Sequence, residues 1–272
     1  FSDILTIPDS FGLGVEFVEK EGPVFNNPIN SSSDINNLNH FDPESLDYVY
    51  KAVKNIKNSL PEEIPLIGFC GSPWTLAAYS IEGRSSKDFE KTLNFLVSNQ
   101  KDVHNLLTKY TDACFLYLRR QVQSGADVIQ IFDSWANLLT KEGLIEYSFN
   151  YINALISALK LDPVTKNIPV IVFARNPKCN IEELINTSAD CISLFWSMND
   201  LNFELAKNKV AIQGNLDPKI LLESDEIIKR ETYKILEKFE KYPGYIFNLG
   251  HGITPDINPD KIKYLTNIVR EY

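Results

Sequence analysis

Three polar side chains of different chemistry lie at the ends of short apolar runs that are far apart in the chain. Asp3 lies in a run at the start of the chain, Ser134 follows the run at 128–132, and His251 follows the run at 245–249. Enzymes built on parallel strands place their catalytic side chains at the carboxyl ends of those strands. These positions therefore favour a functional role, and the hydroxyl of Ser134 is suited to bind a carboxylate.

Each of these residues also has a structural explanation. Asp3 can cap a turn or a helix start, and Ser134 can be a helix N-cap, a role that does not exclude binding. A lone histidine such as His251 is usually a satisfied core residue. Gly250 and Gly252 on either side of it favour presentation of the ring by a tight turn.

Tyr79 and three phenylalanines carry little functional information on their own. Tyr79 lies beyond a turn at 71–73 and, taken alone, is an ordinary amphipathic core residue. Phe1, Phe69 and Phe132 lie at matching strand ends, where core packing explains each of them singly.

The sequence shows no metal-ligand cluster and no convincing pair of acids. Asp133 and Asp217 could act as a pair, but Asp217 precedes Pro218 and is better explained as a helix N-cap, so we assign neither to catalysis. The cysteines lack the close spacing of zinc or redox motifs and are interpreted as free thiols: Cys70, Cys114, Cys179 and Cys191. We therefore expect no bound metal.

The elements that must position these residues alternate along the chain. Short apolar runs predict six buried strands, at 65–70, 128–132, 168–173, 191–195, 210–213 and 245–249. Amphipathic helices are predicted between them, with apolar faces formed by Leu46, Val49, Val53 and Ile56, by Val103, Leu106, Tyr110, Ala113 and Tyr117, and by Ile152, Leu155, Ile156 and Leu159. This βαβα order favours a parallel sheet covered by helices.

Local signals add further detail. An acidic or amide side chain followed by proline marks helix starts at 42–43, 217–218 and 258–259. Residues 12–25 predict a hairpin or an extended excursion, and the Asn- and Ser-rich residues 26–39 predict an exposed loop.

Five spaced motifs, taken together, are far more specific than any one of them. They are FSDIL at 1–5, GFCGSPWTL at 68–76, FDSW at 132–135, QGNLDP at 213–218 and NLGHG at 248–252. In this order they resemble the uroporphyrinogen decarboxylases of haem biosynthesis, and the resemblance runs over residues 1–272. It implies an α/β fold, a (β/α)₈ TIM barrel, formed as a single domain by residues 1–272.

The resemblance also implies a barrel that is incomplete at its N-terminus. The arginine-bearing N-terminal segment of the family is absent, and 1–5 resembles the end of one further strand. With six strands and this stub against about eight in a closed barrel, we expect residues 1–272 to form part of a longer protein.

The family assigns a role to each residue named above. Its aspartate in FSDIL, here Asp3, accepts hydrogen bonds from the pyrrole N–H groups and stabilises the charge that appears when the pyrrole is protonated. Its tyrosine, here Tyr79, points its hydroxyl toward a substrate carboxylate and helps to orient Asp3. Ser134 and His251 are implied to bind carboxylates, and Phe1, Phe69 and Phe132 to line an apolar cleft.

The reaction implied by the resemblance is the decarboxylation of the acetate side chains of uroporphyrinogen III to give coproporphyrinogen III. No cofactor is implied, because the pyrrole itself serves as the electron sink, and a homodimer is expected. Arg84 and Phe195 depart from the family pattern: Arg84 replaces a glycine, and Phe195 replaces an aspartate before a tryptophan.

Composition excludes several other classes of protein. The net charge of −9 and the dispersed basic residues oppose binding to nucleic acid, and any positive field must be local to the cleft. No apolar stretch predicts a membrane span and no secretory signal is visible, so we expect a cytoplasmic protein. Two alternatives stay open: a non-catalytic tetrapyrrole-binding protein, and decarboxylation or methyl transfer on another substrate.

Overall fold

The computed structural model describes residues 3–19, 22–199 and 201–272 and contains a six-stranded parallel sheet. Its strands follow one another in chain order: β3 (Ile67–Gly71), β4 (Val128–Asp133), β5 (Val170–Ala174), β6 (Cys191–Ser193), β7 (Ala211–Gln213) and β8 (Tyr245–Ile246). Each coincides with one of the six predicted apolar runs. The predicted order of parallel strands is therefore confirmed.

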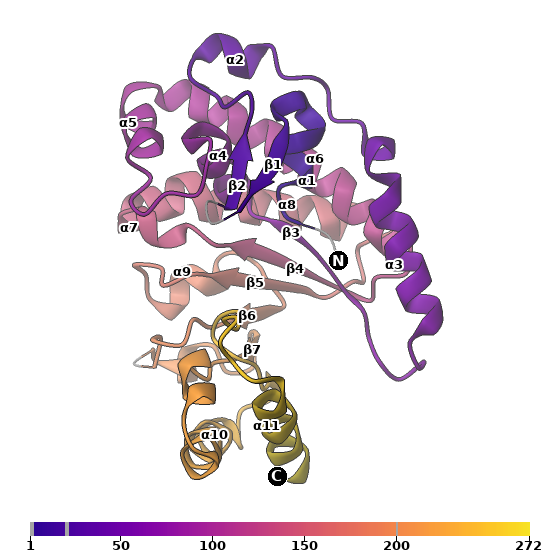
Figure 1. Cartoon of the computed structure of the whole chain (residues 1–272), viewed down its shortest axis with the longest axis vertical. Coiled ribbons are helices and arrows are strands. Elements are labelled where there is room, and N and C mark those ends of the chain that lie inside the picture. The colour runs from indigo at the N-terminus through magenta and orange to yellow at the C-terminus, as the bar shows by residue number, and fades with distance from the viewer. Residues whose placement is uncertain (1–2, 20–21, 200) are drawn as a thin grey trace.

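Helices separate the strands, as the βαβα pattern predicted. Those of nine or more residues are α3 (Asp47–Ser59), α4 (Pro73–Glu82), α5 (Glu90–Ser98), α6 (Gln100–Gln123), α8 (Asn150–Leu161), α10 (Asp225–Phe239) and α11 (Pro259–Glu271). In Figure 1, the long helix α6 lies near the first strands, whereas α10 and α11 lie together near the last ones.

Short helices occupy several of the connections. They are α1 (Thr6–Pro8), α2 (Ser32–Asn36), α7 (Lys141–Gly143), α9 (Ile181–Ile185), the π-helical segments η1 (Asp9–Leu13) and η4 (Leu144–Phe149), and the 3₁₀ helices η2 (Pro43–Leu46), η3 (Ala136–Leu138), η5 (Phe203–Leu205) and η6 (Pro218–Leu222).

The N-terminal region confirms one prediction and corrects two. An antiparallel hairpin, β1 (Val15–Val18) and β2 (Gly22–Phe25), lies where a hairpin or excursion was expected. Residues 26–39 are not all loop, because α2 begins there with a capping box between Ser31 and Asp34. At the start of the chain, residues 3–5 form a turn into α1 rather than the end of a strand, and Phe1 lies outside the described residues.

The proline-marked helix starts are confirmed, with one difference in helix type. Asn258 caps the α-helix α11, whereas Asp42 and Asp217 cap the 3₁₀ helices η2 and η6. Two of the three predicted apolar faces are wholly buried, those of α6 and α8. On α3 the face is buried at Val49 but exposed at Ile56, so it covers the sheet only in part.

A side chain of α6 bonds to the outer edge of β3. The amide of Gln121 accepts from the backbone N–H of Phe69 at 3.0 Å and donates to the carbonyl of Phe69 at 2.8 Å. Gln121 is buried, and its amide satisfies both backbone groups of a residue on an edge strand. The position of Phe69 is thus fixed from both sides, by β4 and by α6.

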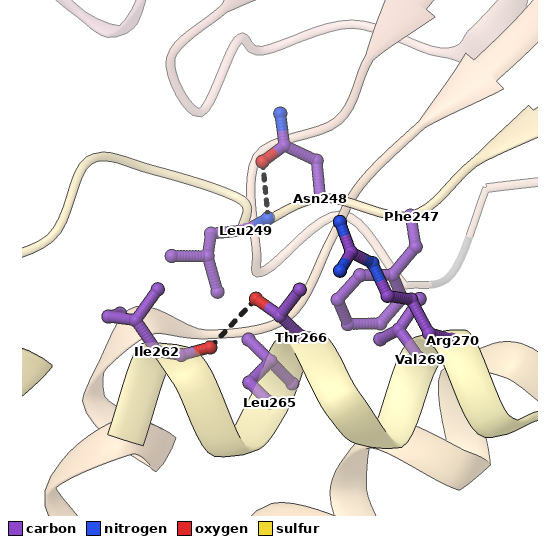
Figure 2. A pocket seen from close by; sticks show the side chains of 8 residues that line it. All are labelled: Phe247, Asn248, Leu249, Ile262, Leu265, Thr266, Val269 and Arg270. Carbon is purple, nitrogen blue, oxygen red and sulfur yellow. Dashed lines mark hydrogen bonds between the residues drawn. The ribbon is translucent and has the colours of Figure 1, made fainter. Parts of the chain in front are cut away.

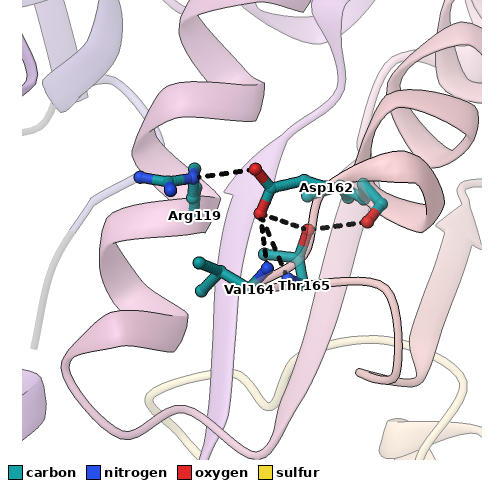
Figure 3. Close-up of polar contacts among 5 residues, drawn as sticks. Arg119, Asp162, Val164 and Thr165 are labelled. Atoms are coloured by element: carbon teal, nitrogen blue, oxygen red, sulfur yellow. Dashed lines mark hydrogen bonds and ion pairs between the residues drawn. The ribbon is translucent and has the colours of Figure 1, made fainter.

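An ion pair ties α6 to the end of α8 (Figure 3). Nε of Arg119 donates to Asp162 at 3.0 Å, and Asp162 also accepts from the backbone N–H of Val164 at 2.9 Å. Desolvation opposes ionisation of Asp162, but these hydrogen bonds outweigh it and lower the pKa of that carboxyl.

Among the described residues, no helix is both long and apolar enough to span a membrane.

This lowered pKa predicts an acid-sensitive contribution to stability. Because the carboxyl has a lower pKa in the folded chain than in the unfolded chain, its contribution is present above about pH 4 and is lost as the pH falls through the folded pKa. Asp162→Asn should lower the melting temperature at pH 7, and its difference from the wild type should narrow at pH 3. Thermal unfolding followed by circular dichroism measures both values. Glu63→Gln, at an exposed position, is the matched control and should show no such difference at either pH.

Candidate active site

The register of the sheet brings predicted site residues to one cavity. Phe132 of β4 pairs with Phe173 of β5, and Phe173 pairs with Ser193 of β6. Because side chains alternate along a strand, Ser134 follows Phe132 on the same face. A cavity of about 330 Å³ lies there, lined by Gln130, Phe132, Ser134, Phe173, Ser193, Asn248, Leu249, His251 and Gly252. Three predicted site residues, Phe132, Ser134 and His251, are therefore together.

Aromatic rings form a continuous path beside this cavity. The ring of Phe132 lies 5.9 Å from that of Phe69 and 6.1 Å from that of Phe173. His251 lies 6.3 Å from Phe173 and 6.0 Å from Phe195, approximately perpendicular to the latter. Sequence reasoning missed Phe173 and the contact of Phe195, although Phe173 ends a predicted strand as Phe69 and Phe132 do.

His251 is exposed at the cavity, so the structure does not support the alternative of a satisfied core histidine. Its turn depends on Gly250, because a Cβ atom there would lie 2.3 Å from the backbone nitrogen of Trp196. Gly252 has open space at the same position. The two flanking glycines thus have different roles, close backbone approach at Gly250 and an open position at Gly252.

The structure also does not support the alternative that Ser134 is a helix N-cap. The nearest helix, η3, begins after Trp135 and has no side-chain cap. Ser134 instead lines the cavity, where its hydroxyl can bind a ligand.

Tyr79 and Asp3 lie in a second group of residues. Tyr79 is in the last turn of α4, with its ring 5.7 Å from both Phe89 and Trp135. Burial raises the pKa of the Tyr79 hydroxyl, and the indole N–H of Trp135 opposes this rise. The negative charge of Asp3 also raises the pKa of Tyr79, whereas the positive charge of Arg175 lowers it. Tyr79 is therefore a neutral donor within electrostatic range of both Asp3 and Arg175.

Asp3 has a structural role as well as its predicted one. Its Oδ1 accepts from the backbone N–H of Leu5 at 2.8 Å, so the turn-cap alternative is confirmed. The side chain is half-buried, and its charge acts on Tyr79. The two groups of site residues adjoin, because Ser134 lines the cavity and the next residue, Trp135, contacts Tyr79.

Asp133 supports the site from outside it. This carboxyl is fully buried and accepts from the hydroxyls of Ser72, Thr75 and Ser148. Burial raises the pKa of Asp133, and the three hydroxyls oppose the shift. Asp133 thereby joins the end of β4 to the start of α4, where Ser72 is the N-cap.

A second cavity, also of about 330 Å³, lies between the segment after β8 and α11 (Figure 2). Its lining is mainly apolar: Phe247, Asn248, Leu249, Ile262, Leu265, Thr266, Val269 and Arg270. The hydrogen bonds drawn there are local, from Leu249 N to Asn248 Oδ1 and from Thr266 Oγ1 to the Ile262 carbonyl. Among the residues that the structure describes, no predicted site residue lines this second cavity, whereas three of them line the first.

Comparison with known proteins identifies the family. The family model for uroporphyrinogen decarboxylase (URO-D) matches residues 1–272. The uroporphyrinogen decarboxylase of Ruthia magnifica subsp. Calyptogena magnifica is 43% identical over 275 residues, covering 100% of this chain and 79% of its own. That of Legionella pneumophila (strain Corby) is 41% identical, covering 100% and 77%. The chain belongs to the uroporphyrinogen decarboxylase family.

Solved structures support the fold assignment. A methyltransferase from Methanosarcina mazei superimposes with a TM-score of 0.75 at 16% identity, covering 100% of this chain and 79% of its own. A B12-independent methionine synthase from Shewanella sp. W3-18-1 gives 0.58 at 14% identity, covering 94% and 74%. The predicted α/β fold of the (β/α)₈ class is confirmed.

In the part of the chain that is described, no three His, Cys, Asp or Glu side chains gather as a metal site.

The close approach of Gly250 to Trp196 gives a prediction about the His251 turn. Gly250→Ala places a methyl group against backbone that cannot move away as a flexible side chain would, so it should cost at least about 2 kcal/mol of unfolding free energy. Gly252→Ala is the matched control and should stay within about 0.5 kcal/mol of the wild type. Urea unfolding of the two variants makes the comparison; equal stabilities would contradict the role given to Gly250.

Proposed function

We propose that this protein decarboxylates the acetate side chains of uroporphyrinogen III to methyl groups, giving coproporphyrinogen III. The observation that carries the proposal is the gathering of Phe132, Ser134 and His251 around one cavity at the carboxyl ends of the strands, in a chain of this family. Phenylalanine rings offer an apolar wall to a macrocycle, and the hydroxyl and imidazole offer hydrogen bonds to its carboxylates.

The chemistry requires stabilisation of a cation rather than a bound electron acceptor. A proton adds to the pyrrole carbon beside the acetate-bearing carbon, and the C–C bond to the carboxylate then breaks with its electrons flowing into the pyrrolium. CO₂ leaves, a second proton completes the methyl group, and loss of the ring proton restores the pyrrole. No metal or organic cofactor is part of this scheme.

Asp3 is assigned the charge-stabilising role. A carboxylate fixed in place before the reaction stabilises a developing cation without reorganisation. The hydrogen bond from Leu5 N holds the Asp3 carboxylate, and Tyr79 lies within range of its charge. In this proposal Tyr79 donates its hydroxyl toward a substrate carboxylate, while Phe69 and Phe132 form the apolar wall; Phe1, for which the same role was predicted, lies outside the described residues.

The alternative is a tetrapyrrole-binding protein without catalysis, which would use the same cavity. Release of CO₂ from uroporphyrinogen under anaerobic conditions supports the enzyme, whereas binding without CO₂ release supports the alternative. We further propose that the protein acts in the cytoplasm and forms a homodimer; sedimentation analysis of the purified protein tests the dimer.

Loss of the Asp3 charge should abolish most of the turnover. Asp3→Asn keeps the shape and can still accept from Leu5 N, but it removes the negative charge that opposes the pyrrolium. We expect kcat to fall at least about 100-fold, with little change in melting temperature. Coproporphyrinogen formation is measured anaerobically in the presence of EDTA.

Asp217→Asn provides the matched control, because asparagine also caps helices and Asp217 caps η6 without lining the cavity. It should keep the wild-type rate. Near-normal turnover in Asp3→Asn would remove Asp3 from the mechanism.

His251→Gln should weaken substrate binding rather than abolish the reaction, because its proposed partner is a carboxylate and not the reacting carbon. We expect KM to rise several-fold and kcat to change less, consistent with loss of about 1 kcal/mol of binding. The exposed position of His251 predicts an unchanged melting temperature. A variant that unfolds would restore the core-histidine explanation.

A further inference from the structure

Arg175 lies at the carboxyl end of β5, one residue beyond the strand. Asp133 pairs with Ala174, and the backbone N–H of Arg175 donates to the carbonyl of Asp133 at 3.0 Å, so the ladder between β4 and β5 continues past the strand ends. Counted on by one residue from this pair, Arg175 comes opposite Ser134, which lines the cavity, although Arg175 itself is not one of the lining residues. The register thus places Arg175 beside Ser134.

The guanidinium of Arg175 is held by an aromatic ring. Its Cζ lies 5.4 Å from the centre of the Trp135 ring, within the range of a cation–π interaction. Its positive charge also acts on the Tyr79 hydroxyl, as does the negative charge of Asp3. Arg175 therefore lies at the junction of the cavity with the Asp3 and Tyr79 group.

This arginine has no ionic partner in the described part of the chain, although it is half-buried. Arg119 and Arg120, by contrast, pair with Asp162 and Glu44. A ring contact satisfies the face of a guanidinium but not the N–H donors at its edge. Those donors match the two oxygens of a carboxylate, which arginine binds through a pair of parallel hydrogen bonds.

We propose that Arg175 is a substrate-binding residue that receives one side-chain carboxylate of the tetrapyrrole and so positions the macrocycle over Asp3. The inference rests on the proposed function, because it takes the ligand to be a polycarboxylate. It supplies a local cation in a chain whose net charge of −9 would otherwise repel such a substrate. Trp135 then holds the arginine and acts as a positioning residue.

The test compares Arg175→Gln with the wild type in two measurements. The first is the anaerobic decarboxylation of uroporphyrinogen III, analysed for KM and kcat separately. The second is equilibrium binding of oxidised uroporphyrin, followed by porphyrin fluorescence at low and high salt. Loss of a charge-assisted hydrogen-bond pair should raise KM and the uroporphyrin Kd about tenfold and should make binding less sensitive to salt. Arg175→Lys, which keeps a point charge, should recover part of the affinity.

Arg119→Gln is the matched control, because it removes an arginine of equal charge from the ion pair of Figure 3. It should lower the melting temperature but leave KM and Kd within about twofold of the wild type. Arg175→Met, which keeps an unbranched stem against Trp135, replaces Arg175→Gln if the latter does not fold.

The two proposals fail in different ways. A wild-type protein that binds uroporphyrin without decarboxylating uroporphyrinogen overturns the proposed function, and the Kd values then decide the role of Arg175. Unchanged KM, Kd and salt dependence in a folded neutral Arg175 variant overturn the assignment of Arg175, whatever the wild-type rate.

Discussion

The strands from β3 to β8 run parallel, and the register between neighbouring strands decides where each functional side chain can point. Gly71, Phe132, Phe173 and Ser193 lie side by side across four strands. If β5 shifted by one residue, each of its side chains would change to the other face of the sheet, and Phe173 would point toward the helices. The cavity, the path of aromatic rings and the position of the guanidinium beside Trp135 all depend on that pairing.

A buried carboxylate reinforces the register from the helix side of the sheet. Asp133 alternates with Phe132 and Ser134, so its side chain points away from the cavity, and it is fully buried. Burial of a carboxyl is costly unless hydrogen bonds compensate it, and Ser72 and Thr75 provide two of them. Since Ser72 is the N-cap of α4, the same group of contacts fixes the helix that carries Tyr79.

Electrostatics then separates two regions of the site. The cavity near His251 and Ser134 offers an imidazole and a hydroxyl for hydrogen bonding among aromatic rings. The junction near Tyr79 has one negative and one positive side chain, Asp3 and Arg175. A substrate with an electron-rich centre and carboxylates at its periphery uses both regions, because the reacting ring requires a negative partner and the carboxylates require donors.

The sequence alone determined the family, the six strands and the buried face of α6, because motifs, apolar runs and helical periodicity are properties of short segments. It also contained the capping box at Ser31, which the prediction of a loop overlooked. Only the tertiary structure decided that His251 is exposed and lies next to Phe195, that residues 3–5 turn into α1, and that the guanidinium of Arg175 lies over the ring of Trp135. These features depend on which segments meet across the sheet, and contacts between distant residues leave no periodic signal in the chain.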